Sequence, residues 1–112
     1  MFNKHLLVSD LLMELTVEMQ RIGRWQSEAP SAEALASQLP FCVDTLSFDQ
    51  WIQFILIPRM QLLVMQEAEL PSNVSLYPMA TEFYKEELAE VEDLLRLIGR
   101  FDLLLSGKVV DR

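Results

Sequence analysis

The segment from Trp51 to Met65, WIQFILIPRMQLLVM, restricts the possible folds of this chain more than any other part. It is apolar almost without interruption, yet Pro58 and Arg59 stand side by side in its middle. Its 15 residues are fewer than the roughly 20 that an α-helix needs to cross a bilayer. Gln53 and Gln61 also argue against lipid surroundings. The segment therefore predicts a helix of a water-soluble protein.

A helical wheel separates the apolar side chains of this segment into three strips. The strip centred on Trp51 has the width of an ordinary core stripe and contains Phe54, Ile55, Pro58, Leu62 and Met65. A second strip contains Ile52, Leu56 and Leu63, and a third contains Ile57 and Val64. A helix that is apolar nearly all round is buried nearly all round. Either the other helices wrap it completely, or one of its faces lies in the core and another against a partner.

Pro58 and Arg59 each allow a structural and a functional interpretation. Pro58 has no backbone N–H, so the carbonyl of Phe54 loses its usual helical partner, at a cost of about 3 kcal/mol. The resulting kink either lets the helix curve around its neighbours or opens polar backbone to a ligand or partner. Arg59 either pairs with an acid as a structural clamp, the candidates being Asp44, Asp49 and the acids of the last helix, or points outward as a donor.

The first part of the chain also shows helical spacing. Apolar residues recur with a helical period from Lys4 to about Trp25, which predicts a helix with one core face. That face contains Val8, Leu11, Leu12, Leu15, Met19 and Ile22. After Pro30, a short helix is predicted over Ala32–Gln38 with Ser31 as its N-cap. Pro40–Leu46 then reads as a connecting segment.

The start of the apolar helix has a specific signal. Ser47 and Gln50 have the spacing of a capping box, in which each side chain bonds the backbone N–H of the other residue. The helix is therefore expected to begin at Phe48 and to continue to Gln66 or Glu67.

The last helix has the clearest periodicity, and it completes the predicted fold. It is expected to run from Met79 to Leu105 without a break, with Pro78 in its first turn and Gly107 as its stop. Its predicted core face contains Phe83, Tyr84, Leu88, Val91, Leu94, Leu95, Ile98, Phe101 and Leu105. No segment has the alternation of a strand. We predict a single all-α domain over residues 1–112, a largely antiparallel four-helix bundle with three long helices and one short one.

The charge of the chain narrows its possible partners. Its 17 acidic and 9 basic side chains give a formal net charge of −8. Such a surface repels phosphate backbones and anionic lipid head groups, so we expect no direct nucleic-acid binding and no membrane association. A basic protein is the partner that this charge favours.

The residues that usually perform catalysis or bind metals are scarce. The chain has one cysteine, Cys42, and one histidine, His5. Cys42 is expected to be a buried apolar residue. Helical bundles with metal centres use glutamate and histidine pairs on several helices, which a single histidine cannot supply. We therefore expect no metal, no cofactor, no catalytic residue and no enzymatic activity. The first residues lack the pattern of a signal peptide, which predicts a cytoplasmic protein.

Several short motifs resemble those of one bacterial family. Pro40-Phe41, Asp44-Thr45, Trp51, Gln53 and above all LIPRM at Leu56–Met60 are similar to the central motif of the YqcC-like proteins. Leu70-Pro71 and Tyr77-Pro78 fit the same pattern, and the resemblance is specific over residues 40–78. It implies an all-helical bundle and no known activity. Because some relatives are encoded beside a tRNA pseudouridine synthase, it also implies an accessory role.

Two hypotheses of function follow. The first is a non-enzymatic protein-interaction or accessory protein whose partner is a protein, either an RNA-modification enzyme or a second copy of the chain. The residues predicted to contact a partner or ligand are Phe41, Asp44, Trp51, Gln53, Pro58, Arg59 and Met60. The alternative is a small-molecule or lipid binder with an apolar pocket between helices, lined by Phe41, Trp51, Phe54 and Met60.

Overall fold

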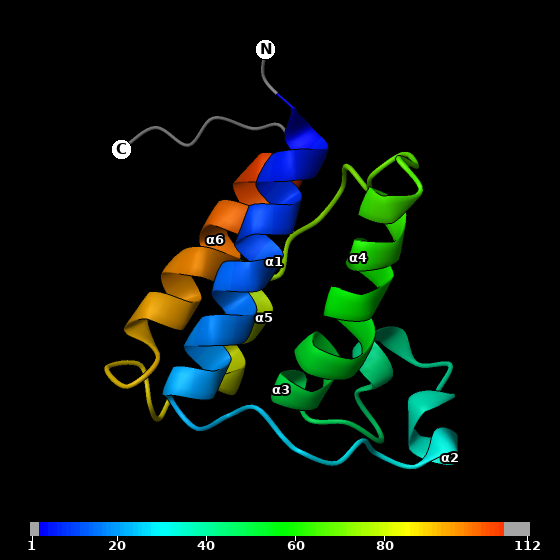
Figure 1. The fold of residues 1–112 in the computed structure, drawn as a ribbon. Helices are drawn as coiled ribbons and strands as arrows, with labels where there is room; N and C mark the ends of the chain where they lie inside the picture. The colour runs from blue at the N-terminus through cyan, green and yellow to red at the C-terminus, as the bar shows by residue number, and fades with distance from the viewer. Residues whose placement is uncertain (1–2, 107–112) are drawn as a thin grey trace.

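The structure is a computed structural model that describes residues 3–106, and within this range every regular element is helical (Figure 1). The predicted all-α class is therefore confirmed. The elements in chain order are α1 (Lys4–Arg21), α2 (Ala32–Leu35), the 3₁₀ turn η1 (Pro40–Cys42), α3 (Phe48–Trp51), the π turn η2 (Ile52–Leu56), α4 (Ile57–Met65), α5 (Tyr77–Phe83) and α6 (Glu92–Ser106). The predicted stop at Gly107 lies outside the described residues.

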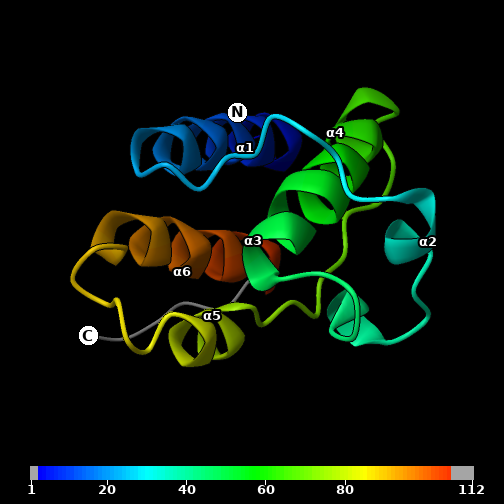
Figure 2. The same ribbon diagram turned by 90° about the horizontal axis from the view of Figure 1, so that it is seen from below.

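Helix α1 packs against both α4 and α6 and runs antiparallel to each of them (Figure 1). Helix α5 packs against α6 on the side away from α1 (Figure 2). The core face predicted for α1 is confirmed, because Val8, Leu11, Leu12, Leu15 and Met19 are all buried. The same holds for the part of the predicted last helix that forms α6, where Leu94, Leu95, Ile98, Phe101 and Leu105 are buried.

Helix α1 ends at Arg21, earlier than the predicted end near Trp25. Gly23 adopts a left-handed conformation with φ +78°, and the N–H of Arg24 bonds the carbonyl of Met19 at 2.8 Å. This is the backbone geometry that closes many helices at a glycine. The chain then leaves the helix, and α2 is likewise shorter than predicted, ending at Leu35.

The predicted unbroken last helix is wrong. The chain forms α5 and α6 as separate helices joined by turns over residues 84–91, and Phe83 and Leu88 of the predicted core face are exposed. Tertiary hydrogen bonds explain the break. The carboxylate of Asp102 in α6 accepts from the N–H groups of Leu76 and Tyr77 at 2.9 and 2.7 Å, which caps the start of α5. These bonds hold α5 alongside α6, a position that a straight helix could not reach.

The capping box predicted at the start of the apolar helix is confirmed. The Ser47 hydroxyl accepts from the N–H of Gln50 at 3.1 Å, and the Gln50 side chain accepts from the N–H of Ser47 at 2.9 Å. From this start, α3, η2 and α4 follow one another without a gap over residues 48–65.

The centre of this helix contains a π turn, in which the N–H of Ile57 bonds the carbonyl of Ile52, five residues earlier. Such a turn takes one residue more than an α turn, so each later side chain is displaced by roughly 100° around the axis. The buried row with four-residue spacing, Phe48, Ile52, Leu56 and Met60, shows the effect. In a regular helix this row would drift by about 40° at each step. The π turn cancels most of that drift and keeps the row in the core.

The π turn also changes which of the predicted strips faces the core after it. The predicted second strip is covered by this chain itself, because Ile52 and Leu56 are buried and Leu63 is partly buried against the core. The strip predicted to be the core stripe instead reaches solvent after the π turn, where Pro58, Leu62 and Met65 are exposed. The helix is therefore not wrapped on all sides. No helix within residues 3–106 combines the length and apolar content of a membrane span.

The π turn makes the effect of Pro58 on stability small. Pro58 comes directly after Ile57, whose N–H closes the turn, and it lies on the exposed face. Its missing N–H therefore costs little stability. We expect Pro58→Ala to change the free energy of unfolding by less than about 1 kcal/mol, compared with about 3 kcal/mol for proline inside a regular helix. Urea denaturation measures the difference, with Arg59→Ala as the exposed neighbouring control. A stabilisation near 3 kcal/mol would show that the turn does not accommodate the proline.

Candidate functional site

The predicted site residues do not form one surface. Phe41, Trp51 and Met60 do lie together, around a hollow of about 200 Å³ that Phe101 also lines. Phe41 packs edge-on against Trp51 with ring centroids 4.9 Å apart. Trp51 and Met60 are buried, however, and Phe54 is not among the lining residues. The hollow is also smaller than the roughly 300 Å³ at which ligand pockets begin.

Gln53 is buried and hydrogen-bonded to the chain itself. Its side-chain oxygen accepts from the N–H of Gln26, and its side-chain nitrogen donates to the carbonyl of Gln26, both at 2.8 Å. A buried amide with both of its polar ends satisfied is a structural feature. Gln53 therefore fastens the segment after α1 to the apolar helix.

Arg59 is exposed, and within residues 3–106 it makes no ion pair. The clamp considered for Arg59 does not form within residues 3–106, and two of its candidate partners bind other residues. Asp49 binds Arg24, and Asp44 accepts a hydrogen bond from the Ser37 hydroxyl at 2.5 Å. The alternative, in which Arg59 points outward beside the exposed Pro58, agrees with the structure.

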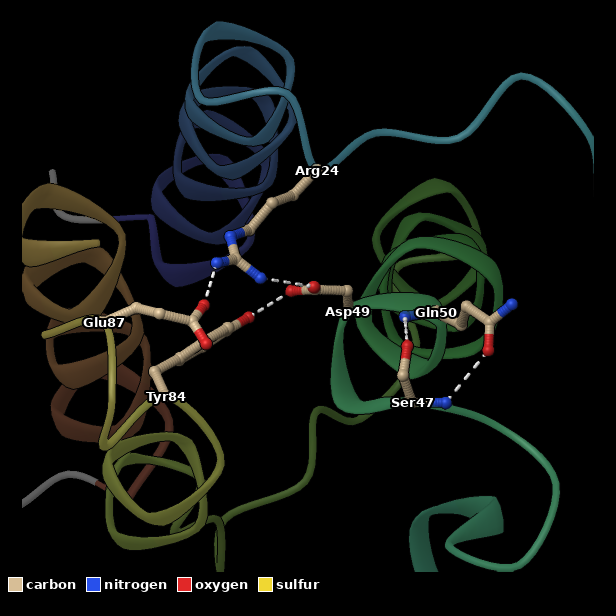
Figure 3. A network of polar contacts seen from close by, with 6 residues as sticks. All are labelled: Arg24, Ser47, Asp49, Gln50, Tyr84 and Glu87. Atoms are coloured by element: carbon tan, nitrogen blue, oxygen red, sulfur yellow. Dashed lines mark hydrogen bonds and ion pairs between the residues drawn. The ribbon is translucent and has the colours of Figure 1, made fainter. Parts of the chain in front are cut away.

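A polar cluster of Arg24, Asp49, Tyr84 and Glu87 joins three parts of the fold (Figure 3). Arg24 follows α1 and donates to Asp49 of α3 at 2.9 Å. Its second terminal nitrogen donates to Glu87 in the turns before α6. The hydroxyl of Tyr84 donates to the other oxygen of Asp49, and the guanidinium of Arg24 lies 5.2 Å from the centre of the Tyr84 ring.

Burial strengthens this polar cluster. The side chains of Arg24 and Asp49 are 23% and 14% exposed, so solvent screens their ion pair less than a surface pair. Burial and, after it, the negative charge of Asp49 raise the pKa of Tyr84 far above its usual value. The phenol therefore stays protonated and continues to donate to Asp49. The cluster fixes the start of α3 relative to α1 and α5.

An apolar groove of about 330 Å³ lies beside the polar cluster. Three segments line it: η1 with the residues that follow it, the first residue of α3, and α5. Figure 2 shows α5 below α3, on the side of the molecule away from α1. The lining residues are Phe41, Val43, Leu46, Ser47, Phe48, Met79, Glu82 and Phe83. We call this feature the α3–α5 groove. Of the residues predicted to contact a partner, Phe41 lines it and Asp44 follows Val43 in the chain.

The wall of the groove at Phe41 has an unusual backbone. Phe41 and Cys42 both adopt left-handed conformations, with φ of 59° and 49°. Residues with side chains seldom adopt this conformation, and such strain persists only where surrounding contacts enforce it. Here the contacts come from Phe41 on Trp51 and from the buried side chain of Cys42. The strained pair directs Phe41 inward and Val43 outward.

The side chains that line the groove are mostly apolar. Its lining is apolar apart from Ser47 and the carboxylate of Glu82. Cys42 is buried, and His5 bonds the carbonyl of Ala68 at 2.7 Å. In the part of the chain that the structure describes, no three His, Cys, Asp or Glu side chains gather as metal ligands would. An apolar lining of this kind suits contact with another apolar surface.

Neither the groove nor the polar cluster is predicted by the local sequence pattern. The helical period places Tyr84 on a core face, and its hydroxyl is the one signal of the cluster, because a buried tyrosine usually finds a hydrogen-bond partner. Val43 and Glu82 gave no comparable signal. The groove depends on segments that are far apart in the sequence.

Comparison with known proteins identifies related sequences. The family model DUF446, described as "tRNA pseudouridine synthase C", matches residues 7–104. An uncharacterized protein of Haemophilus influenzae is 39% identical over 84 residues, which cover 75% of this chain and 78% of that protein. The tRNA pseudouridine synthase C of Pectobacterium carotovorum subsp. carotovorum is 40% identical over 66 residues, which cover 59% of this chain but only 18% of that protein.

The uncharacterized protein YqcC of Escherichia coli is similar in sequence and in fold. It is 30% identical over 90 residues, which cover 74% of this chain and 83% of YqcC. The solution NMR structure of E. coli YqcC superposes with a TM-score of 0.85, covering 99% of this chain and 95% of that one at 22% identity. The sequence match thus agrees with the resemblance to YqcC-like proteins, and the superposition supports the helical fold.

The Tyr84 hydrogen bond gives a prediction with a defined pH dependence. Tyr84→Phe keeps the ring but removes the bond to Asp49, and we expect it to lower the free energy of unfolding by about 1.5–3 kcal/mol at neutral pH. The raised pKa of folded Tyr84 means that its contribution is complete below the unfolded pKa of about 10 and is lost as pH rises above it. The difference between wild type and variant should therefore shrink above about pH 10.

Urea denaturation of both proteins at about pH 8 and about pH 10.5 measures this effect, because other titrating groups contribute equally to the two proteins. Tyr77→Phe is the matched control, since Tyr77 is 43% exposed. A Tyr84→Phe deficit that stays constant across this range would contradict the role given to the phenol.

Proposed function

We propose that this chain, which belongs to the YqcC-like family described by DUF446, is a non-enzymatic accessory protein of a tRNA pseudouridine synthase. One observation carries the proposal. A segment similar to more than half of this chain lies within a protein named tRNA pseudouridine synthase C, most of which extends beyond the match. A sequence of this kind is therefore joined to a larger polypeptide of that name in Pectobacterium carotovorum subsp. carotovorum.

Covalent joining keeps two protein parts together without a stable interface. A short flexible linker gives an effective concentration in the millimolar range, so even weak contacts between the parts persist. Two separate chains lose this advantage and need an interface of their own. On this proposal, the chain binds the synthase through part of its surface.

The charge of the chain supports this choice of partner. An enzyme that binds tRNA needs basic surface for the phosphate backbone. This chain has a net charge of −8, which disfavours direct contact with RNA and favours encounter with a basic protein. In the proposed arrangement the chain contacts the enzyme, and the enzyme alone contacts the tRNA.

The binding of a small molecule or lipid has less support. The hollow at Phe41, Trp51 and Met60 is small, and the larger α3–α5 groove has exposed side chains in its walls. A second copy of this chain could use the same exposed apolar surface as a protein partner. The oligomeric state of the isolated chain separates that arrangement from the proposed one.

The proposal is tested with the purified chain and the purified tRNA pseudouridine synthase C of the same organism. We expect the two proteins to elute together in gel filtration at low salt, and the chain alone to form no pseudouridine in tRNA. An acidic protein of similar size and net charge controls for unspecific attraction. Separate elution of chain and synthase at about 50 μM each, without an affinity measurable by calorimetry, would overturn the proposal.

A further inference from the structure

The α3–α5 groove leaves apolar surface uncovered at a place that the fold holds firmly. Val43 is 60% exposed and Phe83 is 43% exposed, and both line the groove. Single exposed apolar residues are common, but two of them bordering an apolar hollow are less so. A binding site for an apolar anchor side chain has this form.

The floor of the groove is preformed. Phe48 is buried there, and its ring centroid lies 6.2, 5.8 and 5.9 Å from those of Trp51, Phe83 and Tyr84. Tyr84 is in turn held by the polar cluster. A site that is ordered before binding loses little conformational entropy on binding, which favours affinity.

The one charged residue in the lining of the groove is acidic. Glu82 lines it, and Asp44 follows Val43 in the chain. Lys85 pairs with Glu82 at 3.0 Å, but both side chains are exposed, so this surface pair contributes little and leaves Glu82 available. Charge complementarity therefore calls for an occupant with positive charge beside its apolar anchor.

From this geometry we propose that the α3–α5 groove docks a segment of the synthase in which a large apolar side chain is flanked by lysine or arginine. The inference rests on the proposed function and names the surface and chemistry through which it is carried out. The apolar side chain enters between Val43 and Phe83, and the basic side chains meet Glu82 and Asp44. The volume of the groove suits one or two large side chains.

Val43→Glu tests the apolar part of the site. It places a charge at the mouth of the groove without touching the core, and we expect the affinity for the purified synthase to fall at least about tenfold. Val17→Glu is the matched control, because Val17 is 57% exposed and lies at the junction of α1 and α6. Calorimetry measures the affinities, and thermal denaturation verifies that the variants fold.

Glu82→Lys tests the charged part. The side chain of Glu82 is 74% exposed, so its reversal leaves the fold intact and should weaken binding while lowering its dependence on salt. Glu14→Lys is the matched control, since Glu14 also forms one surface ion pair, with Arg100 at 3.5 Å. Affinities at about 50 mM and about 300 mM sodium chloride give the salt dependence.

The outcomes separate this inference from the proposed function. If the wild-type chain does not bind the synthase, the proposed function fails and the docking site fails with it. If the wild type binds and Val43→Glu binds equally well, only the docking site is overturned. Loss of binding in Val17→Glu with retention in Val43→Glu would place the interface at the junction of α1 and α6. Leu62→Glu provides the same test for the exposed face of α4.

Discussion

The arrangement of the core depends on the wider turn formed by the hydrogen bond from the N–H of Ile57 to the carbonyl of Ile52. Without that additional residue in one turn, the side chains before and after it would face different directions. With it, Phe48 at the start of the helix and Met60 near its middle both enter the core. The same turn precedes Pro58, so the residue that cannot donate a hydrogen bond stands where the regular pattern is already interrupted.

Helical periodicity predicted the parts of the fold in which the helix stays regular. The core faces of α1 and α6, the capping box at Ser47 and the all-α class all follow from local spacing, and the structure confirms them. The wheel of the apolar helix was wrong because it assumed one angle per residue across the π turn. The periodicity of this helix could not indicate its core side, because nearly every face carries apolar residues. Which face is buried depends on how the other helices pack against it.

The break between α5 and α6 has a similar explanation. The residues around Tyr84 fit a continuous helix, but in the fold they bind Asp49 and Arg24, and Asp102 caps the start of α5. None of these partners is local in sequence. The α3–α5 groove was beyond prediction for the same reason, because its lining residues extend from Phe41 to Phe83 in the sequence. The left-handed backbone at Phe41 and Cys42 also has no glycine that would indicate it. Among the residues predicted to contact a partner, Gln53 and Met60 are buried, whereas Phe41 lines the groove.

The two walls of the groove are held with unequal strength. The α5 wall is capped by Asp102 and fixed by buried Tyr84. The opposite wall, residues 40–46, is attached through the Phe41 ring and the buried side chains of Cys42 and Leu46, but its side-chain hydrogen bonds, from Ser37 to Asp44 and from Thr45 to the carbonyl of Ala34 at 2.7 Å, are exposed. Exposed bonds open at lower cost than buried ones. Any adjustment of the groove to an occupant therefore falls on the wall that carries Val43, while the polar cluster keeps the floor and the α5 wall in place.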